Sequence, residues 1–174
     1  MPKIIDHVRE RAIAEAKRIM LAEGYQSLTI RRVAAALDVA VGTIYNYFPS
    51  KDFLIASVML EDWTEILQRL QNEKPAEEGI ERIHRVFDGI KEFSDRYQQV
   101  WAQYSGQSFR SEANVHHVEL VLQIQQLLKG VVGEEARTED PFRERFLAEN
   151  VLRFASDGHT EFSLVEGSFR KLIL

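Results

Sequence analysis

Apolar residues recur along most of the chain at spacings of three and four positions, which is the pattern of amphipathic helices, and alternating strand-like runs are short. The first stripe predicts a helix over residues 4–22, followed by Gly24 where a left-handed C-terminal cap is expected. A second helix opens at Thr29, whose hydroxyl can act as the N-cap, and buries the apolar residues within 33–37.

A third short helix is predicted over 41–47, after a tight turn at 38–40. Phe48 then packs inward, and a Pro-Ser pair ends this helix and caps a long fourth helix over 51–72. The first fifty residues therefore form three helices, and the tight turn between the last two is typical of a helix-turn-helix.

The rest of the chain continues with helical spacing. It predicts a fifth helix over 80–93, a shorter sixth over 97–104, a loop at 107–112, and a seventh helix that Ser111 caps and Gly130 ends.

Two more helices follow. Asp140-Pro141 is the pattern of a helix start, an N-cap followed by proline at the first position, and Asp157-Gly158 ends this eighth helix. A ninth helix begins at about Thr160 and runs to the end of the chain. We therefore predict an all-α fold of about nine helices, with a head at 1–50 and a helical body at 51–174.

Charge is distributed unevenly between these two parts. The whole chain has a net charge of −5, but residues 1–53 contain eight basic and six acidic side chains, a net charge of +2, which leaves −7 on the remainder. A slightly basic head on an acidic body fits a head that binds an anion.

Several classes of function are disfavoured by what the sequence lacks. There is no cysteine, and therefore no disulfide, thiolate nucleophile or cysteine-bound metal. The start of the chain lacks the pattern of a secretory signal, and no apolar run approaches the roughly 20 residues that span a membrane. We expect a cytoplasmic protein with no membrane partner.

The predicted helix-turn-helix has candidate DNA-contacting side chains, because the second helix of such a pair lies in the major groove. Gly42 has no side chain and permits close approach to a phosphate. Lys51 adds a positive charge for a phosphate. Four further side chains would face the duplex with hydroxyls and an amide: Thr43, Tyr45, Asn46 and Tyr47.

The stretch AEGYQSLTIRRVAAALDVAVGTIYNYFPSKDFLI, within residues 11–55, resembles the DNA-binding head of the tetracycline-repressor (TetR) family of bacterial regulators. The resemblance implies that Thr29 and Arg31 contact phosphate and base, and Arg31 is the candidate for bidentate reading of a guanine. It implies groove-facing roles for Val41, Gly42, Thr43 and Tyr45, and phosphate contacts for Tyr47 and Lys51.

Three positions depart from the family pattern. Asp38 replaces the usual turn glycine, and Asp tolerates the left-handed conformation at some cost. Ala40 replaces a capping serine and so removes a backbone partner, a loss typically worth about 1 kcal/mol. Val41 is apolar, and two alternatives stay open: contact with a thymine methyl, or weaker base reading.

For the body, the resemblance implies an effector pocket and a dimer interface. Aromatic residues are the candidates for the pocket, and the alternative is that each one fills the core. These candidates are Trp63, Phe87, Phe93, Trp101, Tyr104 and Phe109. Two apolar stripes on the last two helices are the candidates for a homodimer interface, because we expect a monomer to expose them. They consist of Phe142, Phe146, Val151 and Phe154, followed by Phe162, Val165, Phe169 and Ile173.

Histidines give a weaker signal. His84 and Asp88 have the four-residue spacing of metal ligands, but a solvated surface or a hydrogen bond is the favoured interpretation of one pair. His116 and His117 point to different sides of a helix. We therefore predict no metal and no cofactor.

These observations favour a dimeric TetR-type regulator, a repressor that binds double-stranded DNA at a palindromic operator and is released by a small-molecule effector. The alternative is an architectural DNA-binding protein without an effector. An enzyme is disfavoured, because the sequence contains no recognisable nucleophile–base set, no glycine-rich phosphate loop and no metal-binding quartet.

Overall fold

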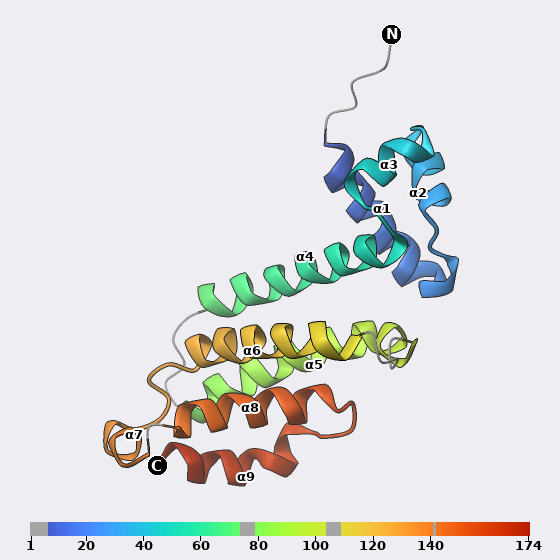
Figure 1. Cartoon of the computed structure of the whole chain (residues 1–174). Coiled ribbons are helices and arrows are strands. Elements are labelled where there is room, and N and C mark those ends of the chain that lie inside the picture. The colour runs from blue at the N-terminus through green and yellow to red at the C-terminus, as the bar shows by residue number, and fades with distance from the viewer. Residues whose placement is uncertain (1–6, 74–78, 104–108, 141) are drawn as a thin grey trace. The chain divides into compact units, whose positions relative to one another are not determined.

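The computed structural model describes residues 7–73, 79–103, 109–140 and 142–174, with side chains described except at 101–103, 109–116, 137 and 139. Over these ranges the chain forms nine α-helices and one short 3-10 helix, and no strand (Figure 1). The prediction of an all-α fold is confirmed. The chain divides into two compact units, Met1–Thr64 and Glu65–Leu174.

The N-terminal unit contains α1 (Val8–Glu23), the 3-10 helix η1 (Tyr25–Ser27), α2 (Ile30–Leu37), α3 (Val41–Tyr47) and the first part of α4 (Lys51–Asn72). Helix α1 contacts η1, α2 and α3, and α2 contacts α3. Each of the α-helices contributes apolar side chains to one small core. Its most deeply buried members include Ile13, Ile19, Leu28, Val33, Ile44, Phe48, Leu54 and Ile55.

The local signals in this unit act as the sequence predicts. Thr29 caps α2, because its Oγ1 accepts a hydrogen bond from the Arg32 amide at 3.2 Å. Asp38 adopts the left-handed conformation, with φ at 57°. Phe48 is fully buried, and Ser50 Oγ accepts from the Phe53 amide at 3.0 Å at the start of α4.

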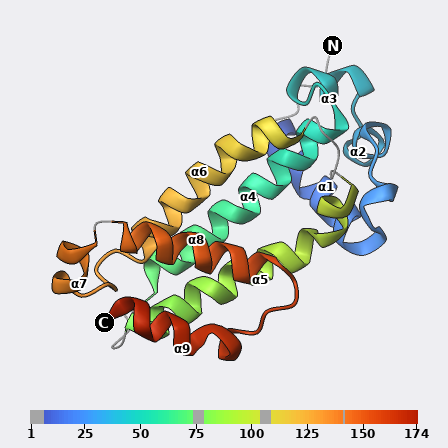
Figure 2. The same cartoon turned by 60° about the horizontal axis from the view of Figure 1, so that its bottom comes forward.

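The C-terminal unit contains the end of α4 and five helices: α5 (Gly79–Gln103), α6 (Phe109–Leu127), α7 (Glu134–Glu139), α8 (Arg143–Ser156) and α9 (Phe162–Ile173). Helix α8 packs against both α5 and α6, and α9 packs against α5 (Figure 2). The domain division predicted at residue 50 stays a prediction, since the two compact units meet further along α4.

Helix boundaries in the C-terminal unit differ from the sequence prediction. Helix α5 is continuous where two helices were expected, because the apolar spacing continues through Ile90, Phe93, Tyr97 and Val100 with no proline or glycine in between. Ser111 lies inside α6 rather than at its start.

The segment before α8 also differs from the prediction. Helix α7 was not predicted, since its sequence EEARTE has little apolar periodicity. Helix α8 begins at Arg143, later than expected. Asp140 nevertheless stabilises the start of α8, because its Oδ1 accepts a hydrogen bond from the Phe142 amide at 2.9 Å.

Gly89 permits close packing between α4 and α5. A Cβ atom at this position would lie 3.0 Å from a Leu70 methyl and 3.3 Å from an Ile66 methyl. A glycine inside a helix costs about 1 kcal/mol relative to alanine. Here the close approach of the neighbouring helix explains its presence.

The expectation that a monomer exposes both terminal apolar stripes is wrong for four of their residues. Val151, Phe162, Val165 and Phe169 are buried within this chain, because α8 and α9 pack on α5. Phe162, for example, stacks on the His84 ring at 4.0 Å and meets Phe87 edge-on at 5.4 Å. Phe154 and Ile173 are half-buried, and only Phe142 and Phe146 of the eight are exposed.

Candidate nucleic-acid interface

Helix α3 buries very little of its own surface against the rest of the N-terminal unit. Of its seven residues only Ile44 is buried, and Phe48 anchors the segment that follows. At 100° per residue, Gly42 and Asn46 lie on the side of α3 opposite Ile44, and Tyr45 lies next to them. This short helix therefore presents nearly all of its side chains to a partner.

The exposed surface of α3 is rich in aromatic and polar groups. Val41, Tyr45 and Tyr47 are 36%, 50% and 45% exposed, which is high for such large apolar side chains in a folded domain. Gly42 and Asn46 are exposed as well, and Thr43 is half-buried. Tyrosine and asparagine side chains can contact phosphates and base edges, so this surface has the chemistry of a DNA reader.

Two neighbouring arginines on α2 have different environments. Arg32 is held within the protein, because its guanidinium donates to the Glu23 carboxylate and, at 2.9 Å, to the Ser27 carbonyl. Arg31 is exposed, and among the described residues no interaction is recorded for its side chain. Arg31 is therefore the cation of α2 that is available to a ligand, and Arg32 is a structural residue. The contact of Arg31 with DNA stays a prediction.

Lys51, in the first turn of α4, is more constrained than a surface lysine. Its ammonium donates to the Tyr25 carbonyl at 3.1 Å and lies 4.1 Å from the centre of the Tyr25 ring. Partial burial lowers the pKa of the Lys51 ammonium, and the Asp52 carboxylate opposes this shift. These contacts hold the Lys51 ammonium in place above the half-buried Tyr25 ring.

Ala40 leaves the start of α3 without a side-chain cap, as expected from its sequence. A backbone bond from the Thr43 amide to the Ala40 carbonyl, 2.9 Å long, closes the first turn. Thr29, which also belongs to the predicted site, is exposed at the start of α2 while its hydroxyl caps that helix.

Of the six predicted pocket residues, three have described side chains, and their surroundings differ. The pocket itself stays a prediction. Phe87 is fully buried in the C-terminal core, and Phe93 packs against Tyr97 with ring centres 5.1 Å apart. Trp63 is buried and belongs to the N-terminal unit. Tyr104 and the side chains of Trp101 and Phe109 lie outside the described residues.

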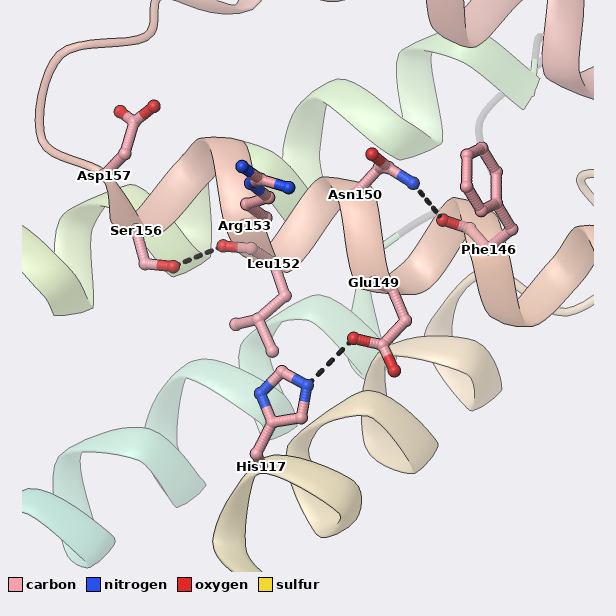
Figure 3. A pocket seen from close by; sticks show the side chains of 8 residues that line it. All are labelled: His117, Phe146, Glu149, Asn150, Leu152, Arg153, Ser156 and Asp157. Carbon is pink, nitrogen blue, oxygen red and sulfur yellow. Dashed lines mark hydrogen bonds and ion pairs between the residues drawn. The ribbon is translucent and has the colours of Figure 1, made fainter. Parts of the chain in front are cut away.

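A groove of about 500 Å³ instead lies along the outer side of α8, beside the exposed Phe146 (Figure 3). His117 of α6 contacts Glu149 of α8, with Nε2 of the histidine 2.8 Å from Oε2 of the glutamate. The groove is lined by His117, Phe146, Glu149, Asn150, Leu152, Arg153, Ser156 and Asp157. Sequence reasoning missed this groove, since most of its lining residues are ordinary polar positions on or beside α8 and their meeting with His117 of α6 depends on tertiary packing. The side chain of His116 lies outside the described residues.

His84 and Asp88 form a surface contact in this structure. Their closest nitrogen and oxygen are 3.5 Å apart, and the His84 ring stacks on Phe162. Among the described residues no group of three or more potential metal ligands comes together. None of the helices described is both long and apolar enough to span a bilayer.

Comparison with known proteins identifies the N-terminal unit. Residues 12–58 match the family model described as bacterial regulatory proteins, tetR family. Over 83 residues, 47% of this chain and 39% of the relative, the chain is 35% identical to the HTH-type transcriptional repressor KstR of Rhodococcus jostii. It is 40% identical over 58 residues, 33% of this chain and 26% of the relative, to KstR of Mycobacterium tuberculosis. The matches span less than half of these relatives.

Solved structures extend the likeness over nearly the whole chain. A TetR transcriptional regulator from Legionella pneumophila is similar over 97% of both chains, with a TM-score of 0.57 and 19% identity. FadR from Bacillus subtilis, solved in complex with stearoyl-CoA, matches 94% of this chain and 97% of its own, with a TM-score of 0.56 and 17% identity. At these identities the likeness shows a shared fold.

Proposed function

Because this chain belongs to the tetR family of bacterial regulatory proteins, we propose that it regulates transcription by binding a palindromic operator as a homodimer. The chain is a regulator and not an enzyme, in line with its relatives. The observation that carries the proposal is the exposed surface of α3, where six of seven residues are not buried. A folded domain has little reason to expose Val41, Tyr45 and Tyr47 together unless they meet a partner.

The roles of the individual residues follow from their environment. Arg31 is available to read a guanine in the major groove, and Tyr45 and Asn46 would contact base edges or phosphates beside it. Lys51, fixed by Tyr25, would supply a phosphate contact with little loss of side-chain entropy on binding. Gly42 would let the backbone of α3 come close to the duplex.

A two-fold dimer suits a palindromic site, because two recognition helices one helical turn apart would each read one half-site. Phe142 and Phe146 support this part of the proposal: they lie four residues apart around the start of α8 and are 72% and 56% exposed. Two phenylalanines can bury on the order of 300–500 Å² between them, so a partner subunit is a natural cover for this patch.

We propose that the regulator is a repressor and that a small molecule bound in the C-terminal unit releases it from DNA. The KstR relatives are repressors, and the fold is shared with a FadR that binds stearoyl-CoA. An effector with a largely apolar surface suits the aromatic residues of α5. As a DNA-binding regulator, the protein would act in the cytoplasm.

Selection of random duplexes by the purified protein tests the DNA-binding part. We expect an enriched palindrome whose binding is weakened by both Tyr45→Ala and Lys51→Ala. Lys51→Ala should weaken binding to all sequences alike and reduce the slope of log affinity against log salt concentration by about one. Tyr45→Ala should also weaken the preference for particular bases. Salt-sensitive binding without an enriched sequence would favour the architectural alternative, and no binding to any duplex would overturn both.

The effector part needs a separate measurement. Native mass spectrometry of the purified protein would detect a co-purified small molecule, and a panel of acyl-CoA thioesters of different chain lengths would be screened for release of the operator. A molecule that raises the melting temperature and lowers operator affinity is the expected result. A panel that changes neither, together with no co-purified molecule, would count against an effector of this class.

A further inference from the structure

Two charged contacts attach α4 to the rest of the N-terminal unit. In the first turn of α4, Lys51 bonds the Tyr25 carbonyl. Eleven residues later, Asp62 forms an ion pair with Lys17 of α1. At 1.5 Å per residue these two points are about 16 Å apart along α4, so together they define the direction of the helix relative to α1.

The Lys17–Asp62 ion pair is unusual because its carboxylate is completely buried. The Asp62 side chain is 0% exposed, whereas Lys17 is 28% exposed. Removing a carboxylate from water is costly, and the attraction to its partner roughly offsets that cost. A pair of apolar side chains of similar volume would often serve stability as well or better. Stability alone therefore does not account for an ion pair at this place.

What an ion pair adds is geometric specificity. Apolar side chains can slide past each other at little cost, but a buried charge loses its compensation as soon as its partner moves away. Asp62 also lies two residues before the boundary between the two compact units at Thr64. It is thus a fixed point of α4 at the end of the N-terminal unit.

We propose that Lys17 and Asp62 are positioning residues for operator binding, which fix the direction of α4 against the helix-turn-helix. Helix α1 connects the pair to the DNA-contacting residues, because it packs directly against α2 and α3. In a dimer, a defined direction of α4 sets how far apart the two recognition helices lie. This inference rests on the proposed function as a dimeric operator reader.

The direct test measures the angle between α1 and α4 without DNA. The chain has no cysteine, so Leu21→Cys on α1 and Leu60→Cys on α4, both at exposed positions, can carry a pair of spin labels. When Lys17 and Asp62 are both present, we expect a narrow distribution of distances between the two labels. In the Lys17→Met/Asp62→Leu background we expect this distribution to broaden or shift. An unchanged distribution would overturn the proposal.

A matched control uses two labels on α4 alone, at Phe53 and Leu60, which are also exposed. The distance between them should not change in any background, because it depends only on the helix itself. If the apolar pair does not fold, Lys17→Gln/Asp62→Asn takes its place, because it removes both charges while it keeps polar groups at the two positions. The same broadening is expected.

The functional test compares the palindromic operator with a single half-site. For the folded double variant we expect half-site affinity within about twofold of the wild type, but palindrome affinity about tenfold weaker, with tolerance of altered half-site spacing. If the double variant instead binds each duplex with the affinity of the wild type and keeps its spacing preference, the pair is structural only. Failure of the wild type to select any palindrome would instead refute the proposed function, and the spin-label result would still decide the role of the pair.

Discussion

Nη2 of Arg32 lies 2.9 Å from each carboxylate oxygen of Glu23, and this contact ties the start of α2 to the end of α1. The adjacent Arg31 is exposed. Two arginines next to each other in the sequence thus have different tasks, one within the fold and one available to a ligand. The contrast yields a matched pair of variants.

Arg31→Ala should weaken operator binding by about 1–3 kcal/mol, the range for loss of a bidentate base contact, and leave stability nearly unchanged. Arg32→Ala should do the reverse and cost roughly 1 kcal/mol of stability or less, since its ion pair is partly exposed. Fluorescence anisotropy and thermal unfolding measure the two effects. Equal losses of affinity in folded Arg31 and Arg32 variants would contradict the assignment.

Gly42→Ala separates folding from DNA binding. A Cβ at this position has no neighbouring atom within 4 Å, so alanine should raise helix stability by up to about 1 kcal/mol. It should lower operator affinity, because the added methyl would stand between α3 and the duplex. Gly167→Ala on α9 is the control: its Cβ also has open space, and we expect the same stabilisation with unchanged DNA binding.

In the proposed homodimer the partner subunit covers Phe146, so Phe146→Asp should give monomers. Loss of a buried phenylalanine contributes about 1.5–3 kcal/mol per protomer, and the introduced charge adds desolvation cost. Analytical ultracentrifugation over a range of concentrations would detect the change. Leu21→Asp, at an equally exposed position on α1, should leave the association state as it is. A Phe146 variant that remains as dimeric as the wild type would exclude the α8 surface as the interface.

Asp157 should make stability depend on pH in acid. Hydrogen bonds from the Thr160 hydroxyl and the His159 amide lower the pKa of this carboxyl below its ordinary value of 3.8. The unfolded chain then takes up the proton first as pH falls, so the stabilisation is complete above about pH 4 and is lost as pH falls through the lower folded pKa.

Asp157→Asn removes this titration while it keeps an acceptor for the turn between α8 and α9. Thermal unfolding would be measured between about pH 2.5 and pH 6, a range that brackets the ordinary carboxyl pKa of 3.8. Below about pH 4 the wild type should lose stability faster than the variant. Asp157→Ala should cost roughly 1 kcal/mol at neutral pH. Parallel curves for wild type and Asp157→Asn would contradict the role of this carboxylate.

The sequence predicted α2 and α3 of the N-terminal unit closely, whereas it gave α1 an earlier start and did not predict η1. Local signals specify this unit: the Thr29 cap, the left-handed Asp38, the inward Phe48 and the Ser50 cap each act within a few residues of their own position. The exposed surface of α3 was predictable for the same reason, because a seven-residue helix with one apolar anchor has nowhere to bury its remaining side chains.

The C-terminal unit was predicted less well, because its boundaries depend on long-range packing. The apolar spacing of α5 does continue past residue 93, but the prediction divided the helix there. EEARTE has no apolar stripe from which α7 could be recognised. The polar residues along the outer side of α8 gave no sign of a groove.

The sequence determined the all-α class, the helix-turn-helix and the side chains on its outer surface, since these follow from spacing and capping over short distances. Only the tertiary structure decided which apolar residues are buried. Phe162 and Phe169 look like Phe142 and Phe146 in the sequence, but the first two pack within the chain and the last two do not. The same holds for charge: nothing near Lys17 or Asp62 in the sequence marks them as partners, and the fold of the N-terminal unit brings them together.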